Sequence, residues 1–189
     1  VRGDSKAWAI SANNGRIKWK IDAIGNDTNL ISNNAPATNK KYAVFGFGNG
    51  EIYTTFKKGG YVLWSSSLSG RNDGSVISAI DDIVASPVIV GRNVFVADGS
   101  GKVVSLKVES GERNWTAPFG SSGNLWVAGK SLFFISNTNH LVRLKIKTGD
   151  AVWMTELPYF SKKRFGGSTK SIRPSGPSIA GPQSVLASS

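Results

Sequence analysis

The sequence contains no cysteine, and its 189 residues include one histidine and one methionine. Without cysteine the chain forms no disulfide, no zinc–thiolate site and no cysteine nucleophile. Long hydrophobic runs are also missing, since none approaches the roughly 18 apolar residues that a membrane-spanning helix needs. No apolar signal segment precedes the structured pattern, which starts close to Val1, so we expect a processed chain or a piece of one.

The composition that remains is that of a folded, basic domain. Hydrophobic residues make up 40% of the chain, which is too many for a disordered protein, and 22 glycines interrupt it too often for a helical bundle. The formal net charge is +11, which favours solubility and association with acidic partners. The length suits one domain with a core of its own, or two small ones.

The chain repeats itself. A glycine followed four residues later by tryptophan occurs four times, and the tryptophans are separated by 45, 51 and 38 residues. Four of the six tryptophans therefore occupy one repeat position, which we expect to be structural. The pairs are Gly15 and Trp19, Gly60 and Trp64, Gly111 and Trp115, and Gly149 and Trp153.

The segment before each repeated glycine has the pattern of a β-strand. A turn position lies ten residues upstream of the glycine. In the last two units apolar residues follow it at every second position, which is the strand period. Two shorter strand-like runs precede that turn in each unit. Four short strands in a repeat of about 45 residues are typical of a β-propeller blade. We expect the repeated tryptophan to lie on the outermost strand and to pack against the neighbouring blade.

The predicted fold is therefore all-β, a β-propeller of four-stranded antiparallel blades with about four blades present. A partial blade covers residues 1–22, complete blades cover 31–67, 83–117 and 122–157, and a second partial blade covers 174–189. Three arrangements fit this frame. The two partial blades complete one shared blade, or the chain is a segment of a longer propeller, or two copies close one ring. We favour the segment, because open blade edges otherwise invite aggregation.

Three segments resemble the repeat of pyrroloquinoline-quinone-type propellers, which carry a Thr-Gly followed by a Trp. They are LKIKTGDAVW (144–153), VSLKVESGERNW (104–115) and WAISANNGRIKW (8–19). Within that superfamily the chain is most similar to the BamB family, lipoproteins of outer-membrane β-barrel assembly in Gram-negative bacteria. The resemblance is strongest over 34–64 and 79–115. It implies an eight-bladed ring of which this chain supplies about half. The family's lipid-bearing cysteine is missing, which agrees with a fragment.

The resemblance also implies a function, a location and a site. The family works at the periplasmic side of the outer membrane as a non-catalytic scaffold. Its inter-blade loops bind the POTRA repeats of BamA, and its blade edges are expected to meet nascent outer-membrane proteins. The matching residues here are Ile80, Asp81 and Asp82 in the long excursion 67–87, and Asn124 in the next loop. Asn124 stands where the family often has Asp.

Enzymatic alternatives find little support in the residues. Quinone-dependent dehydrogenases share the repeat, but they use Ca²⁺, a catalytic Asp and commonly a vicinal Cys pair. The adjacent carboxylates Asp81 and Asp82 are better explained as turn or strand-start hydrogen-bonding groups, and His140 as a surface turn residue. We therefore predict no catalytic residue, no cofactor and no metal. The alternatives left open are a fragment of a quinone-dependent dehydrogenase, and a propeller sensor or adaptor with another protein partner.

One further segment is a candidate for binding. Residues 161–173 contain five Lys and Arg, and no acidic residue follows Glu156 in the chain. Such a stretch suits anionic lipid headgroups or nucleic acid. Aromatic residues are sparse around it, so we expect a solvated loop, or contact with acidic protein or lipid surfaces rather than with nucleic acid.

Overall fold

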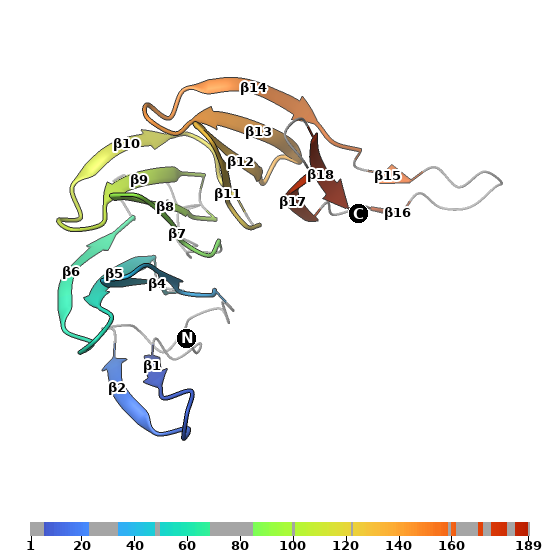
Figure 1. Ribbon diagram of the computed structural model, residues 1–189. Helices are drawn as coiled ribbons and strands as arrows, with labels where there is room; N and C mark the ends of the chain where they lie inside the picture. The colour runs from blue at the N-terminus through green and yellow to red at the C-terminus, as the bar shows by residue number, and fades with distance from the viewer. Residues whose placement is uncertain are drawn as a thin grey trace, which may run out of the picture.

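The computed structural model describes residues 6–22, 34–47, 50–68, 85–99, 101–121, 123–158, 160–161, 170–171, 175–180 and 184–188. Every regular element within these ranges is a β-strand. The strands form antiparallel sheets that follow one another along an arc (Figure 1). The all-β propeller fold predicted from the sequence is therefore confirmed. No helix in the same ranges is long and apolar enough to cross a membrane.

Three sheets have four strands each, and strands that follow each other in the chain are hydrogen-bonded neighbours in the sheet. The second sheet comprises β3 (Ala37–Thr38), β4 (Tyr42–Gly46), β5 (Glu51–Phe56) and β6 (Val62–Ser67). The third comprises β7 (Val88–Val90), β8 (Asn93–Ala97), β9 (Val103–Lys107) and β10 (Arg113–Ala117). The fourth comprises β11 (Trp126–Ala128), β12 (Ser131–Ile135), β13 (His140–Lys145) and β14 (Ala151–Glu156).

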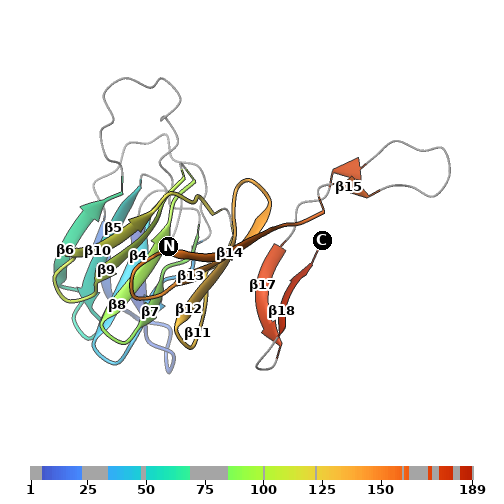
Figure 2. The same cartoon turned by 90° about the horizontal axis from the view of Figure 1, so that it is seen from above.

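Three further sheets have two strands each among the described residues. The first sheet pairs β1 (Lys6–Ile10) with β2 (Ile17–Asp22), and the fifth pairs β17 (Ser175–Ala180) with β18 (Ser184–Ser188). By their place in the repeat, β1 and β2 correspond to the two outer strands of a four-stranded sheet, and β17 and β18 to the two inner strands. A short hairpin of β15 (Phe160–Ser161) and β16 (Lys170–Ser171) projects away from the arc (Figure 2).

The hydrophobic core lies between neighbouring sheets. Alternate residues of a strand point to opposite faces of its sheet. In β8, Val94 and Val96 therefore pack against the second sheet, whereas Phe95 and Ala97 pack against the fourth. All four side chains are fully buried. The same alternation explains why the strands in the middle of each sheet read as nearly continuous apolar runs, since both of their faces are covered.

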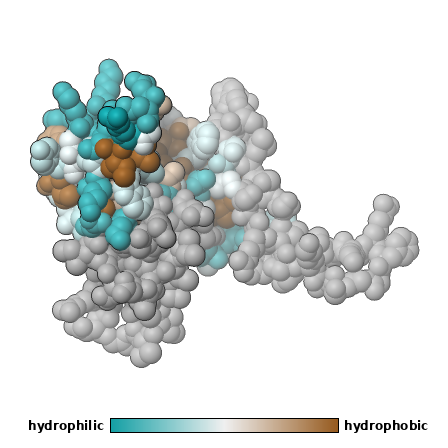
Figure 3. Space-filling view, turned by 90° about the horizontal axis from the view of Figure 1, so that it is seen from below, coloured by the Kyte–Doolittle hydropathy of each residue, from teal (hydrophilic) through white to brown (hydrophobic). Residues whose placement is uncertain are grey.

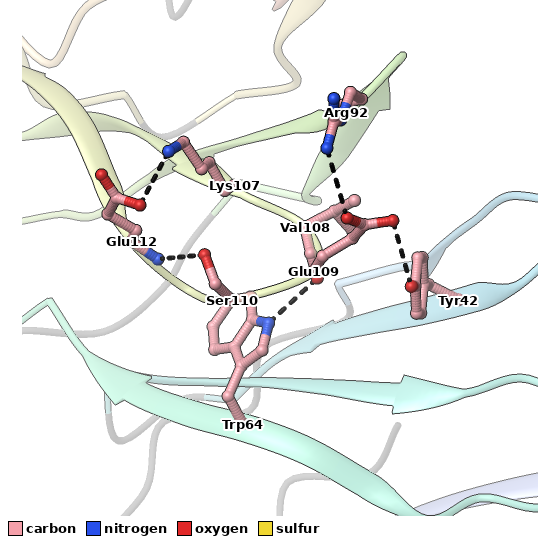
Figure 4. A network of polar contacts seen from close by, with 8 residues as sticks. All are labelled: Tyr42, Trp64, Arg92, Lys107, Val108, Glu109, Ser110 and Glu112. Carbon is pink, nitrogen blue, oxygen red and sulfur yellow. Dashed lines mark hydrogen bonds and ion pairs between the residues drawn. The ribbon is translucent and has the colours of Figure 1, made fainter.

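The three seams that join the first four sheets each contain one repeated tryptophan. Trp64 on β6 lies against Gly111, in the turn between β9 and β10 of the next sheet, and its Nε1 donates a hydrogen bond to the carbonyl of Val108 at 2.9 Å (Figure 4). Trp19 makes the same pair of contacts with Gly60 and with the carbonyl of Lys57 at 3.1 Å. Polar contacts at the second seam flank the indole, among them Tyr42 Oη donating to Glu109 and an ion pair between Glu109 and Arg92 (Figure 4).

Candidate partner-binding surface

Each strand runs between two opposite ends of its sheet. The connections between neighbouring sheets lie at the same end of the strands as the turns that join the second and third strands of each four-stranded sheet. The connection from β6 to β7 covers 68–87, and the connection from β10 to β11 covers 118–125. We call this end the connection end. The opposite end carries the turns with the repeated glycines, and we call it the glycine end.

Both ends of the long connection are anchored in the core. Leu68 and Ala85 have exposed fractions of 1% and 0%. The amide of Leu68 donates to the carbonyl of Gly50 at 3.1 Å, and the hydroxyl of Ser86 accepts a hydrogen bond from the amide of Ala35 at 3.0 Å. Leu68 and Ala85, the described residues that flank 69–84, are therefore fixed in the core.

Of the four residues predicted to bind a partner, the structure places one. Asn124 is exposed on the connection from β10 to β11 and is followed by Leu125, which is buried. Ile80, Asp81 and Asp82 fall within 69–84, which is outside the described residues. Their part in binding, and that of Asn124, stays a prediction.

The short connection is held by a buried serine. The hydroxyl of Ser121 is fully buried and donates to the carbonyl of Ile135 at 2.9 Å. The same hydroxyl accepts a hydrogen bond from the amide of Gly123 at 3.3 Å. A buried hydroxyl with partners on both sides strongly favours one loop conformation, because leaving it unpaired would cost the desolvation of the group.

Two adjacent turns also hold this connection. The amide of Asn137 donates to the carbonyl of Gly120 at 3.0 Å, and its side-chain Nδ2 donates to the carbonyl of Gly99 at 2.8 Å. Asn137 belongs to the fourth sheet and Gly99 to the third, so the side chain bridges two sheets. The backbone that presents Asn124 is thus tied to the rigid part of the fold.

An exposed tryptophan that the repeat pattern does not mark lies next to this connection. Trp126, the first residue of β11, has an exposed fraction of 41%. It lies two residues after Asn124, at the inner strand of its sheet. Tryptophan is enriched among residues that dominate protein interfaces. The sequence shows that Trp126 lies outside the repeated Gly and Trp pairs, which was the available signal for a role other than seam packing. The sequence does not show that its ring is exposed.

At the glycine end, lysines surround a groove of about 690 Å³ between the first and second sheets. Five lysines line it together with Ile10, Trp19 and Phe56, namely Lys18, Lys40, Lys41, Lys57 and Lys58. Lys57 is partly engaged, because its Nζ donates to the carbonyl of Asn39 at 2.7 Å. This groove accounts for part of the net positive charge.

Lys41 has a perturbed pKa. Its Nζ lies 5.0 Å from the ring centroid of Tyr42 and 5.8 Å from that of Phe56. A hydrogen bond with the side chain of Tyr42 raises the pKa of Lys41 above its ordinary value, and the carboxylate of Glu109 adds a smaller contribution in the same direction. Both causes favour the charged ammonium form of Lys41.

The described residues contain no group of three His, Cys, Asp or Glu side chains that could hold a metal ion. His140 contacts Thr138, with 3.1 Å between Nδ1 and Oγ1, which is a contact within its own turn. The buried carboxylate of Asp98 accepts hydrogen bonds from the amides of Gly101 and Lys102 at 2.9 and 2.7 Å, so it closes the turn between β8 and β9. These acidic and imidazole groups organise turns.

The basic segment 161–173 is described at three positions. Phe160 pairs with Ser171 and Ser161 with Lys170, which makes the ends of the segment a short antiparallel hairpin. From the sequence we expected a solvated loop between blades here. The lysines and arginines between the two short strands lie outside the described part of the chain.

The repeated four-stranded antiparallel sheets, joined by seams of tryptophan on glycine, define a β-propeller segment of the pyrroloquinoline-quinone-type repeat class. The family model described as "Outer membrane protein assembly factor BamB" matches residues 1–155. The chain belongs to this family.

The relatives agree with this assignment, and a solved structure shares the fold. The chain is 26% identical over 119 residues to outer membrane protein assembly factor BamB of Moranella endobia, covering 63% of this chain and 31% of that relative. It therefore spans about a third of the length of this relative. The crystal structure of BamB from Moraxella catarrhalis superposes with a TM-score of 0.71 at 17% identity, covering 92% of this chain and 50% of that one.

The fold is shared beyond the family. A europium-containing methanol dehydrogenase superposes with a TM-score of 0.67 at 13% identity, covering 80% of this chain and 38% of that enzyme. At this identity the likeness concerns the fold alone, because one propeller architecture supports unrelated functions.

Proposed function

We propose that the chain is a non-catalytic scaffold of the machinery that assembles β-barrel proteins in the outer membrane. It acts on the periplasmic side of that membrane and binds the POTRA repeats of BamA through the connection end. The contact residues are Ile80, Asp81 and Asp82 of the long connection and Asn124 of the short one. Nascent outer-membrane proteins are further candidates for strand addition to the blade edges.

The observation that carries this proposal is the rigid presentation of the short connection. Ser121 and Asn137 tie it to two sheets, while Asn124 and Trp126, two positions apart in the sequence, remain exposed. A loop fixed in this way loses little conformational entropy when a partner binds, so more of the contact energy appears as affinity. Membership of the family described as outer membrane protein assembly factor BamB supports a partner within the assembly machinery.

The test is a calorimetric titration of the chain with the soluble POTRA region of its cognate BamA. We expect saturable binding that Ile80→Asp abolishes and that Trp126→Ala weakens at least about fivefold, because truncation of an energetically important interface tryptophan costs more than about 1 kcal/mol. The matched control is Tyr61→Ala, which removes an aromatic ring that is 76% exposed at the glycine end. This control is expected to bind like the unaltered chain.

A folded chain that binds no POTRA repeats would contradict the proposal. Equal losses in Trp126→Ala and Tyr61→Ala would contradict the connection end as the contact surface. An absorbance change and calcium uptake on adding pyrroloquinoline quinone would instead favour a dehydrogenase fragment.

A further inference from the structure

The glycine end of the first two sheets carries positive charge without carboxylates to balance it. Exposed basic side chains lie there on β2, on the turn before it and on two turns of the second sheet, namely Arg16, Lys18, Lys40, Lys41, Lys57 and Lys58. All of these except Arg16 line the groove of about 690 Å³ between the two sheets. Within the described part of the chain, none of them forms an ion pair.

The third sheet pairs its charges at the same end. Arg92 lies 3.5 Å from Glu109, and Lys107 lies 2.7 Å from Glu112. Glu109 stands two residues before the repeated glycine of that sheet, and Glu112 stands one residue after it. The repeat therefore has two positions at this end from which a carboxylate can neutralise a neighbouring basic side chain.

The second sheet has no carboxylate at either position. Lys58 stands two residues before Gly60, and Tyr61 stands one residue after it. Between Glu51 and Asp73 the sequence contains no acidic residue. The turn from β5 to β6 therefore carries its two lysines without an acidic partner of its own.

One carboxylate of a neighbouring sheet does act on this surface. Glu109 contributes to the raised pKa of Lys41, although less than the side chain of Tyr42 does. The two oxygens of the Glu109 carboxylate contact Tyr42 Oη at 3.3 Å and Arg92 at 3.5 Å. Since Glu109 is engaged in this way, the other basic side chains around the groove are left for an external anion.

Exposed apolar side chains lie beside these basic residues. Tyr61, Ile17 and Val62 have exposed fractions of 76%, 63% and 49%. A Cβ on Gly59 would lie 2.7 Å from Cε2 of Tyr61, so the ring lies across the turn from β5 to β6. Ile17 and Val62 occupy one repeat position, two residues after the repeated glycine. Figure 3 shows the molecule from the side of the first sheet, where hydrophobic side chains lie among hydrophilic ones.

We propose that this end of the molecule docks on a membrane that contains anionic phospholipids. Residues 16–18, 40–41 and 57–62 form the contact, and we call them the lysine surface. The lysine ammonium groups meet the headgroup phosphates, while Tyr61, Ile17 and Val62 enter the interfacial layer. Long lysine side chains suit this arrangement, because they reach the headgroups while neighbouring apolar groups leave water.

The position of the apolar side chains favours a membrane over an acidic protein segment. Ile17, Tyr61 and Val62 do not line the groove, so a segment seated in the groove would leave them in water. A broad anionic surface covers both the lysines and these side chains. Docking of this kind turns the connection end away from the membrane. The proposal goes beyond the binding of BamA and does not depend on it.

Co-sedimentation of the purified chain with phospholipid vesicles tests the proposal. One preparation is phosphatidylcholine alone, and the other contains phosphatidylcholine and phosphatidylglycerol in equal parts. We expect binding to the second preparation and not to the first, and added salt should weaken it because salt screens the charges. A folded chain that does not bind the anionic vesicles would overturn the proposal.

Two double variants with the same loss of charge locate the contact. Lys41→Gln with Lys58→Gln is expected to weaken binding about 30-fold, since each lysine contributes about 1 kcal/mol at an anionic surface and 1.4 kcal/mol corresponds to a factor of ten. The matched control is Lys130→Gln with Lys147→Gln, because these exposed lysines occupy the same repeat positions in the fourth sheet. The control is expected to bind nearly as tightly as the unaltered chain. Equal losses in both variants, or no loss in either, would assign the binding to other basic residues such as those of 161–173 and would overturn the proposal.

Tyr61→Ala separates membrane docking from the contact at the connection end. It is expected to weaken vesicle binding and to leave POTRA binding intact, whereas Trp126→Ala is expected to do the reverse. A Tyr61→Ala variant that binds vesicles like the unaltered chain would contradict the entry of this ring into the membrane. Saturable binding of polyglutamate by a chain that ignores the anionic vesicles would show that the occupant is an acidic protein segment instead.

Discussion

Trp115 of the third sheet lies over Gly149 of the fourth, and its Cε3 is 2.6 Å from the point where a Cβ on Gly149 would stand. The indole Nε1 donates to the carbonyl of Ile146 in the same turn at 3.1 Å. The turn therefore offers the indole two things, namely the space of a missing side chain and a backbone acceptor. Each can be tested separately.

We expect Gly149→Ala to destabilise the fold more than Gly129→Ala. Both glycines have positive φ, at +77° and +56°, so each substitution costs roughly 1–2 kcal/mol for backbone strain. At Gly149 the new methyl group also collides with the ring of Trp115, and overpacking adds about 1–3 kcal/mol. At Gly129 nothing lies within 4 Å. Urea unfolding of the two variants measures the difference. Equal losses of unfolding free energy would show that Gly149 is not needed to leave room for the ring of Trp115.

We expect Trp115→Phe to lower the free energy of unfolding by about 1 kcal/mol beyond its loss of ring area, because the carbonyl of Ile146 loses its donor. The matched control is Trp126→Phe, since the indole of Trp126 is 41% exposed. Chemical denaturation followed by circular dichroism compares them. A Trp115→Phe variant as stable as the control would show that the hydrogen bond contributes nothing net.

Ser121→Ala should destabilise the chain by about 1–3 kcal/mol, because it leaves the buried carbonyl of Ile135 and the amide of Gly123 without their partner. Ser110→Ala is the control, since the hydroxyl of Ser110 accepts its hydrogen bond from the amide of Glu112 at an exposed turn. Thermal unfolding gives the comparison. Hydrogen exchange of the amide of Gly123 should also accelerate in Ser121→Ala, and unchanged exchange would argue against a fixed connection.

The pKa of Lys41 should lie above 10.5 and should fall in Tyr42→Phe, because the hydrogen bond to the tyrosine side chain is the largest cause of the shift. Glu109→Gln should lower it less, since the charge of Glu109 is a smaller cause. A raised folded-state pKa stabilises the protein below the unfolded-state value, and this contribution is lost as the pH rises through the folded-state pKa. Titration of the lysine ¹³Cε resonance by NMR measures the shift. A larger fall in Glu109→Gln than in Tyr42→Phe would reverse this assignment.

Local pattern predicted much of this fold. The alternation of Val142 and Leu144 indicated a strand that the structure places at His140–Lys145. The turn predicted before that strand is also present, and there Asn139 adopts a positive φ of 64°. Such features depend on a few neighbouring residues and on the steric limits of the backbone, so the sequence contains them directly.

The candidate surface was less accessible to sequence reasoning. Asn124 could be placed on a connection between blades, but the ties from Ser121 and Asn137 join residues of different sheets and leave no periodic signal. The exposure of Trp126 was equally hidden. The sequence did not indicate which tryptophan outside the repeat would be buried and which would face solvent.

The sequence by itself determined the repeat, the strand period and the position of each glycine and tryptophan. Tertiary structure decided that Trp19, Trp64 and Trp115 each dock on the repeated glycine of the following sheet rather than on that of their own sheet. It also decided that Trp126 is 41% exposed while Leu125, just before it, is buried. The physical reason is that a side chain is buried only where a second surface packs against it. That surface comes from a distant part of the chain, so neighbouring apolar residues differ in burial.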